Sequence, residues 1–388
     1  MHREIPSPPD RTPSTSAFTR WLSLQAYGLV TRTLFRPATP PLTMRRRFER
    51  FSARSREAIR ARHPAVVFGD TRSGALAIET VRATPNPPRR LLYLHGGAFV
   101  MGSAASYRSR AIRFAYRCDA EVFVPEYRLA PEHPYPAALE DAVSAWRALT
   151  ESDDPRPALV AGDSAGGGLA LSLLVRIRQL GQPAPRGAVL LSPWTNLSGA
   201  AVVGQHRDLW LGADHLRCWA RHYLGVADPH DPLVSPAYAD LSGLSPLLVL
   251  VGEHEALAEE TLRLVARARE VGTGARLLVG PRMQHDWPLT LPWLAESRLA
   301  WREIAEFVKR SDNPPHRRTR AALAWSSNMT AVTPETVSEQ TAEPRPGTLA
   351  RRLTSLLVRI RTAAGEDLQA TIARAIEEAF VGLHREMR

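Results

Sequence analysis

The sequence predicts an α/β fold in which a mostly parallel sheet is covered by helices on both faces. Between about residues 64 and 310, short apolar segments alternate with longer segments of helical periodicity. Several short segments are near-continuous runs of Val, Leu and Ala, as is typical of strands buried on both faces. Alternation of this kind favours parallel strands joined by helical crossovers.

Eight strands and five helices are expected in this part of the chain. The strands are at 65–68, 76–81, 91–95, 121–125, 158–162, 187–192, 247–252 and 276–279, and the helices at 107–118, 137–150, 165–180, 255–271 and 295–309. An insert at 196–240 separates the sixth and seventh strands and contains a further helix at 213–224. An insert at this point can cover the carboxyl ends of the strands, where sheets of this class bind ligands.

The segments on either side have a different composition. Residues 1–62 begin with a Pro- and Ser-rich stretch, expected to be disordered, and continue as two helices broken by Pro37, Pro40 and Pro41. Residues 63–310 form the expected catalytic domain, 311–347 a flexible linker, and 348–388 an amphipathic helical tail. For the tail, homo-oligomerisation or docking on the body is favoured over weak membrane-surface contact, because its second half is acidic as well as basic.

Composition and charge narrow the class of protein. The chain has 388 residues, a formal net charge of +11 and 44% hydrophobic residues, which is ordinary for a globular protein. Lys309 is the only lysine, so the positive charge reflects a uniform use of arginine, and with no recognition motif we expect no nucleic-acid partner. Cys118 and Cys218 lie outside any metal-ligand spacing and are expected to be reduced and buried. Without a secretory signal pattern, a cytoplasmic location is expected.

The candidate nucleophile is Ser164, in the sequence Gly-Asp-Ser-Ala-Gly-Gly at 162–167. This G-x-S-x-G pattern follows a predicted strand and begins a predicted helix, which is the arrangement of a nucleophile elbow. The serine lies on a strained turn, so its neighbours must lack bulk where backbones approach closely. The free N–H groups at the start of the helix can stabilise a developing oxyanion.

A second glycine-rich turn lies upstream, at His95-Gly96-Gly97-Ala98-Phe99, directly after a predicted strand. We expect the N–H groups of Gly96 and Gly97 to form an oxyanion hole with that of Ala165. His95 is expected to brace the turn and not to act as a base.

An acid and then a histidine are needed downstream of the serine, in that chain order. His285 is the histidine that follows the last predicted strand. Glu253 and Glu255 both leave the seventh strand and both qualify as the acid that orients the imidazole. His254, between them, is interpreted as part of the loop.

Together these motifs resemble the hormone-sensitive-lipase-like esterases, a branch of the α/β-hydrolases, over about residues 44–310. Six segments carry the resemblance. Residues 95–99 resemble HGGGF, 127–138 resemble YRLAPEHPFPAA, 162–167 resemble GDSAGG, 192–196 resemble SPWTD, 231–236 resemble DPLVSP and 251–257 resemble VGSDEVLL. The resemblance implies an α/β-hydrolase fold, Glu255 as the acid, His285 as the base, and a lid formed by the N-terminal helices and the insert. Ala98 replaces the third glycine of the family's HGGG, and Asn196 stands where the family often has Asp.

These observations predict a serine carboxylesterase that hydrolyses small acyl esters through Ser164, Glu255 and His285. This chemistry needs no metal and no cofactor. Within the same chemistry, a deacetylase or lactone hydrolase acting on a natural product stays open. A small-molecule receptor is the alternative from another class, but receptors on this fold usually lack a triad member, and all three are present here.

Overall fold

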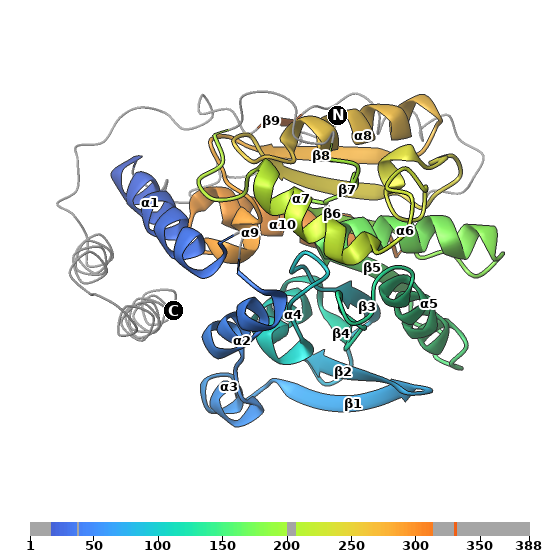
Figure 1. The fold of residues 1–388 in the computed structure, drawn as a ribbon. Helices are drawn as coiled ribbons and strands as arrows, with labels where there is room; N and C mark the ends of the chain where they lie inside the picture. Colours follow the sequence, from blue (N-terminus) through green and yellow to red (C-terminus); the bar gives the residue numbers. More distant parts are fainter. Residues whose placement is uncertain (1–16, 37–38, 200–206, 313–329, 332–388) are drawn as a thin grey trace, which may run out of the picture.

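One sheet of nine strands organises the described part of the chain, residues 17–36, 39–199, 207–312 and 330–331 of a computed structural model (Figure 1). Its order is β1-β2-β4-β3-β5-β6-β7-β8-β9. The strands β3 to β9 run parallel, whereas β2 is antiparallel to both β1 and β4. Their bounds are β1 Val67–Ser73, β2 Leu76–Arg82, β3 Arg89–Leu94, β4 Ala120–Pro125, β5 Ala158–Asp163, β6 Ala188–Leu191, β7 Leu247–Gly252, β8 Ala275–Gly280 and β9 Thr330–Ala331.

The predicted mostly parallel sheet is confirmed: its eight strands correspond to β1–β8, and β9 adds two residues beside β8. The first strand was misplaced, because β1 starts at Val67 and extends to Ser73. Most side chains of β1 are exposed, and the strand is defined by its hairpin with β2, from Val67 opposite Arg82 to Ser73 opposite Leu76. Pairing of this kind leaves no apolar run in the sequence.

Helices cover both faces of the sheet. α4 packs against α10, α5 packs against α6, and the two pairs lie on opposite sides of the sheet (Figure 1). Fully buried Trp146 and Trp301 belong to the cores beneath these pairs. The helices after β3 are α4 Ala104–Cys118, α5 Ala137–Thr150, α6 Ala165–Gln179, α7 Ala213–Leu224, α8 Ala258–Glu270, α9 Trp287–Thr290 and α10 Ala295–Arg310, with a 3₁₀ turn η1 at Pro236–Tyr238.

Two predicted helix starts were wrong. α4 begins three residues early, because Ser103 forms a capping box with Ser106: the Ser103 Oγ accepts from the Ser106 N–H, and the Ser106 Oγ accepts from the Ser103 N–H. α8 begins three residues late, at Ala258. Glu255 belongs instead to the turn after β7, with its side chain buried.

The N-terminal segment contains three helices where two were expected: α1 Ala17–Leu34, α2 Pro41–Ser52 and α3 Arg56–Arg62. The extra break occurs because Ser55 caps α3 by accepting from the Ala58 N–H.

These helices contact the insert. Trp210 donates from Nε1 to the Tyr27 hydroxyl at 3.0 Å, and its ring lies 5.4 Å from that of Phe35. The Phe35 carbonyl in turn is 2.8 Å from His215 Nε2.

Three sequence predictions fall on residues outside the described ranges: the disordered start, most of the linker, and the helical tail at 348–388. Among the helices that are described, none is both long and apolar enough to cross a membrane. Cys118 is buried as expected, but Cys218 on α7 is only half-buried.

Candidate active site

Ser164 lies on the sharp turn between β5 and α6, at the carboxyl end of the sheet. Its backbone has φ +50° and ψ −121°, which is strained for a residue with a side chain. The turn is tight: a Cβ on Gly162 would lie 2.2 Å from the Gly166 carbonyl oxygen, and one on Gly166 would lie 2.1 Å from the Leu94 carbonyl oxygen. Glycine is therefore required at positions 162 and 166, because the backbones there approach too closely for a side chain. This tight turn leaves Ser164 Oγ accessible to a side chain from another loop.

That partner is His285, in the loop between β8 and α9. The Nε2 atom of His285 is 2.8 Å from Ser164 Oγ, which is hydrogen-bonding distance. The imidazole is buried, and the Tyr27 hydroxyl of α1 donates to the His285 carbonyl at 3.0 Å. The structure thus brings together two residues that are 121 positions apart in the sequence.

Glu255 faces the other nitrogen of the same imidazole. Its Oε1 is 3.9 Å from His285 Nδ1, close enough for an ion pair but longer than a hydrogen bond. Within the described residues, both atoms are buried and neither has a hydrogen-bond partner. The second oxygen, Oε2, is fixed by the Ser192 hydroxyl at 2.7 Å and the Gly252 N–H at 3.0 Å.

The other candidates lie apart from this group. Glu253 is exposed and accepts a hydrogen bond from the Arg282 N–H at 2.7 Å. His95 is fully buried between the rings of Tyr107 and Tyr127, and burial lowers its pKa to about 4. His254 is half-buried in the loop beside Glu253. Of the alternatives, only Glu255 approaches His285 Nδ1.

The glycine-rich turn after β3 differs from the sequence prediction at one position. The Gly96 N–H donates to the buried Asp163 Oδ1 at 3.0 Å, so the expectation that Gly96 contributes to the oxyanion hole is not met. The next two residues have left-handed backbones, with φ +111° at Gly97 and +54° at Ala98. Within the described residues, no protein acceptor is recorded for the N–H groups of Gly97, Ala98 and Ala165.

Asp163 supports this turn from below and was missed as a functional residue. Besides the Gly96 N–H, its Oδ1 accepts from the Tyr93 hydroxyl at 2.6 Å. Burial raises the pKa of Asp163, while Arg110 and these two hydrogen bonds lower it. Its position beside Ser164 in the elbow motif was the available signal, but the motif alone does not say where its side chain points.

Asp286 and Ser192 were also missed. Asp286 directly follows His285, and its Oδ2 is 3.5 Å from His285 Nε2, the atom that contacts Ser164. Its N–H donates to Ser192 Oγ at 3.0 Å. Burial by itself lowers the pKa of His285, but the charges of Asp286 and Glu255 outweigh it and raise that pKa to about 10.

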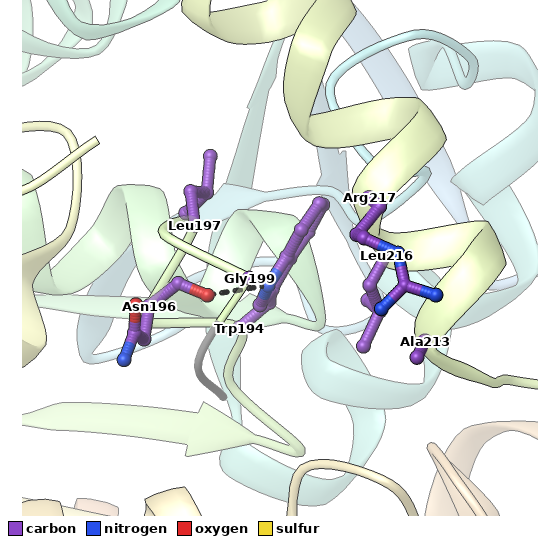
Figure 2. Close-up of a pocket in the computed structure, with 7 residues that line it drawn as sticks. All are labelled: Trp194, Asn196, Leu197, Gly199, Ala213, Leu216 and Arg217. Carbon is purple, nitrogen blue, oxygen red and sulfur yellow. Dashed lines mark hydrogen bonds between the residues drawn. The ribbon is translucent and has the colours of Figure 1, made fainter. Parts of the chain in front are cut away.

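A pocket lies beside the insert, between the segment after β6 and the start of α7 (Figure 2). It encloses about 210 Å³ of empty space that is partly open to solvent. Trp194 lies between Leu197 and Leu216, with its Nε1 donating to the Asn196 carbonyl at 2.9 Å. The Trp194 N–H donates to the Ser164 carbonyl, so this apolar wall is tied directly to the elbow.

In the part of the chain that the structure describes, no three His, Cys, Asp or Glu side chains form a group that could hold a metal ion.

Comparison with known proteins places this chain in a family. The family model for the alpha/beta hydrolase fold matches residues 91–289. An acetyl-hydrolase of Streptomyces hygroscopicus is 40% identical over 240 residues, 61% of this chain and 80% of that protein. An esterase of Acinetobacter venetianus is 32% identical over 255 residues, 64% of this chain and 84% of that protein.

Solved structures agree. The crystal structure of an esterase from the bacterial hormone-sensitive lipase family superposes with a TM-score of 0.64 at 32% identity, covering 77% of this chain and 99% of that one. The chain therefore belongs to the α/β-hydrolase family, in its hormone-sensitive-lipase-like branch of carboxylic ester hydrolases.

Proposed function

We propose that Ser164, His285 and Glu255 form the catalytic triad of a serine carboxylesterase. The observation that carries the proposal is the 2.8 Å contact between Ser164 Oγ and His285 Nε2, with Glu255 facing Nδ1 of the same ring. His285 accepts the Ser164 proton as Oγ attacks the ester carbonyl, and then gives that proton to the leaving alcohol. A water molecule, activated by His285 in the same way, releases the acyl group and restores Ser164.

Glu255 orients the imidazole and stabilises its positive charge. The separation of 3.9 Å between Oε1 and Nδ1 shortens to a hydrogen bond as His285 becomes protonated, since catalytic contacts in ligand-free structures are often long. Ser192 and Gly252 hold the other carboxylate oxygen, so that only Oε1 is left to face the ring.

The oxyanion hole is assigned to the N–H groups of Gly97, Ala98 and Ala165. Ala98 takes the place that the sequence had given to Gly96, whose N–H is bonded to Asp163. Two of these donors come from the turn after β3 and one from the start of α6, where the helix dipole adds to the stabilisation. Each donor contributes about 2.7–4 kcal/mol to transition-state stabilisation.

The substrate class that fits best is an ester of a small acyl group, acetyl above all. The support is the acetyl-hydrolase relative. The same relative keeps a deacetylase of a natural product as the second candidate, because an N- or O-acetyl group passes through the same acyl-enzyme. We infer further that α1–α3 and the 207–240 part of the insert form the lid, since Tyr27 of α1 contacts both Trp210 and His285.

Replacement of the nucleophile tests the proposal. Ser164→Ala should lower kcat/KM for p-nitrophenyl acetate by at least ~10⁴-fold and abolish labelling by a fluorophosphonate probe. Wild-type protein should label once per chain. Wild-type hydrolysis by the variant would overturn the proposed nucleophile, and a wild-type chain that neither labels nor hydrolyses would favour a non-catalytic receptor.

A further inference from the structure

A second carboxylate faces His285 from the side opposite Glu255. Asp286 has a left-handed backbone, φ +57° and ψ 30°, and this conformation turns its side chain back toward the preceding ring. Its Oδ2 lies 3.5 Å from Nε2, whereas Glu255 faces Nδ1. Its Oδ1 is buried, with no hydrogen-bond partner among the described residues. A buried carboxylate with one unpaired oxygen is costly unless a positive charge offsets it.

We propose that Asp286 is a positioning residue for the base, whose carboxylate stabilises protonated His285 from the Nε2 side. This inference rests on the proposed role of His285. Asp286 then provides a second counter-charge in addition to that of Glu255. With both charges present, the imidazole of His285 binds a proton more tightly and releases it less readily.

The charged and titratable groups around the pair support this arrangement. Burial raises the pKa of Asp286 well above its ordinary value, and the nearby carboxylates of Asp163 and Glu255 add to this rise, whereas protonated His285 and Arg110 act against it and favour the charged form. The carboxylate of Asp286 in turn raises the pKa of His285. The other groups that face the pair are the carboxyl groups of Asp163, Glu255 and Asp208 and the phenols of Tyr27 and Tyr107.

The backbone couples the two counter-charges. The Asp286 N–H donates to Ser192 Oγ, and the same Ser192 hydroxyl donates to Glu255 Oε2. Ser192 therefore joins the backbone of the loop after β8 to the carboxylate of Glu255 in the turn after β7.

Two opposing effects on catalysis follow. A base with a raised pKa removes the Ser164 proton more readily, so the limiting rate at high pH is higher. The same shift keeps more of His285 protonated near neutral pH, where it cannot accept that proton. The acid limb of the pH–rate profile should therefore lie well above the ordinary histidine value of about 6.5.

The direct test is Asp286→Asn, because asparagine has nearly the same shape and tolerates the left-handed backbone. The acid limb of kcat/KM should move down by about one pH unit or more, so that the variant is up to about tenfold more active than wild type on the acid side. Its limiting rate at high pH should be several-fold lower. Glu253→Gln is the matched control, because it removes an exposed carboxylate that does not approach His285, and its profile should coincide with that of wild type.

An unchanged acid limb in Asp286→Asn would overturn the inference, as would an equal shift in Glu253→Gln. A measurement on unmodified protein makes the test independent of the folding of the variant: the pH dependence of inactivation by a fluorophosphonate reports His285 protonation. An acid limb at or below about 6.5 there would also overturn the inference. Neither result would contradict the proposed triad. The triad is tested by a different experiment, and wild-type activity of Ser164→Ala would contradict it.

Discussion

The two sides of the proposed reacting centre are formed by different chemical groups. On the oxyanion side, the turn after β3 presents backbone N–H groups from left-handed residues, supported by the buried Asp163. On the base side, the loops after β7 and β8 present the side chains of Glu255, His285 and Asp286. Backbone amides do not titrate, whereas the imidazole of His285 does. Changes on the first side should therefore scale the rate, and changes on the second should also move its pH dependence.

The largest effect after removal of the nucleophile is expected on the base side, from Glu255→Gln. Loss of this charge should lower kcat by on the order of 10³–10⁴-fold, because the imidazole loses its orientation and a counter-charge. The acid limb should move to lower pH, because Glu255 raises the pKa of His285. The measurement is a pH–rate profile with p-nitrophenyl acetate, and a loss smaller than tenfold would argue against Glu255 as the triad acid.

Gly97→Ala addresses the oxyanion side. A Cβ at Gly97 would lie 2.2 Å from the Met101 carbonyl oxygen, on a backbone with φ +111°. The displaced turn should lower kcat by about 10²- to 10³-fold and leave the acid limb where it is. Steady-state rates across the pH range provide the check.

Its control is Gly272→Ala, at a glycine with φ +81° and open space around the added Cβ. This variant should lose about 1 kcal/mol of stability through backbone strain and keep its activity. A moved acid limb in Gly97→Ala, or an equal loss of activity in the control, would remove the distinction between the two sides.

A smaller effect on activity is expected from Tyr93, which supports Asp163 beneath the turn after β3. Tyr93→Phe deletes the 2.6 Å hydrogen bond to Asp163 Oδ1. The free energy of unfolding should fall by about 1–3 kcal/mol, since a buried acceptor loses one of its donors, and activity should fall only several-fold. Urea unfolding monitored by tryptophan fluorescence would measure this, with the exposed Tyr116→Phe as the control. Equal stability of the two variants would mean that Asp163 does not depend on Tyr93.

Ala98→Gly should have the smallest effect. Glycine relieves the left-handed strain at φ +54° and keeps the N–H. We expect stability to rise by up to about 1 kcal/mol and kcat/KM to stay within about threefold of wild type. A loss greater than tenfold would show that the Ala98 methyl group itself shapes the site.

The same contrast explains how far the sequence could predict this molecule. The sequence could predict that Ser164 and His285 meet, because strand-end motifs are local and parallel strands bring their carboxyl ends to one edge of the sheet. The Gly96 assignment failed because its N–H is bonded to Asp163, 67 residues away, and a motif does not show which donors are already paired. Asp286 was overlooked although it adjoins His285, because its left-handed backbone decides where its side chain points.

The central claim is that Ser164 carries the acyl group. Wild-type protein mixed with p-nitrophenyl acetate, quenched in acid within the first turnovers and digested, should yield one acetylated peptide, the one that contains Ser164. Glu255→Gln should yield the same peptide more slowly, and Ser164→Ala should yield none. An acetyl group on a different residue, or an acetylated Ser164→Ala chain that still turns over, would contradict the account.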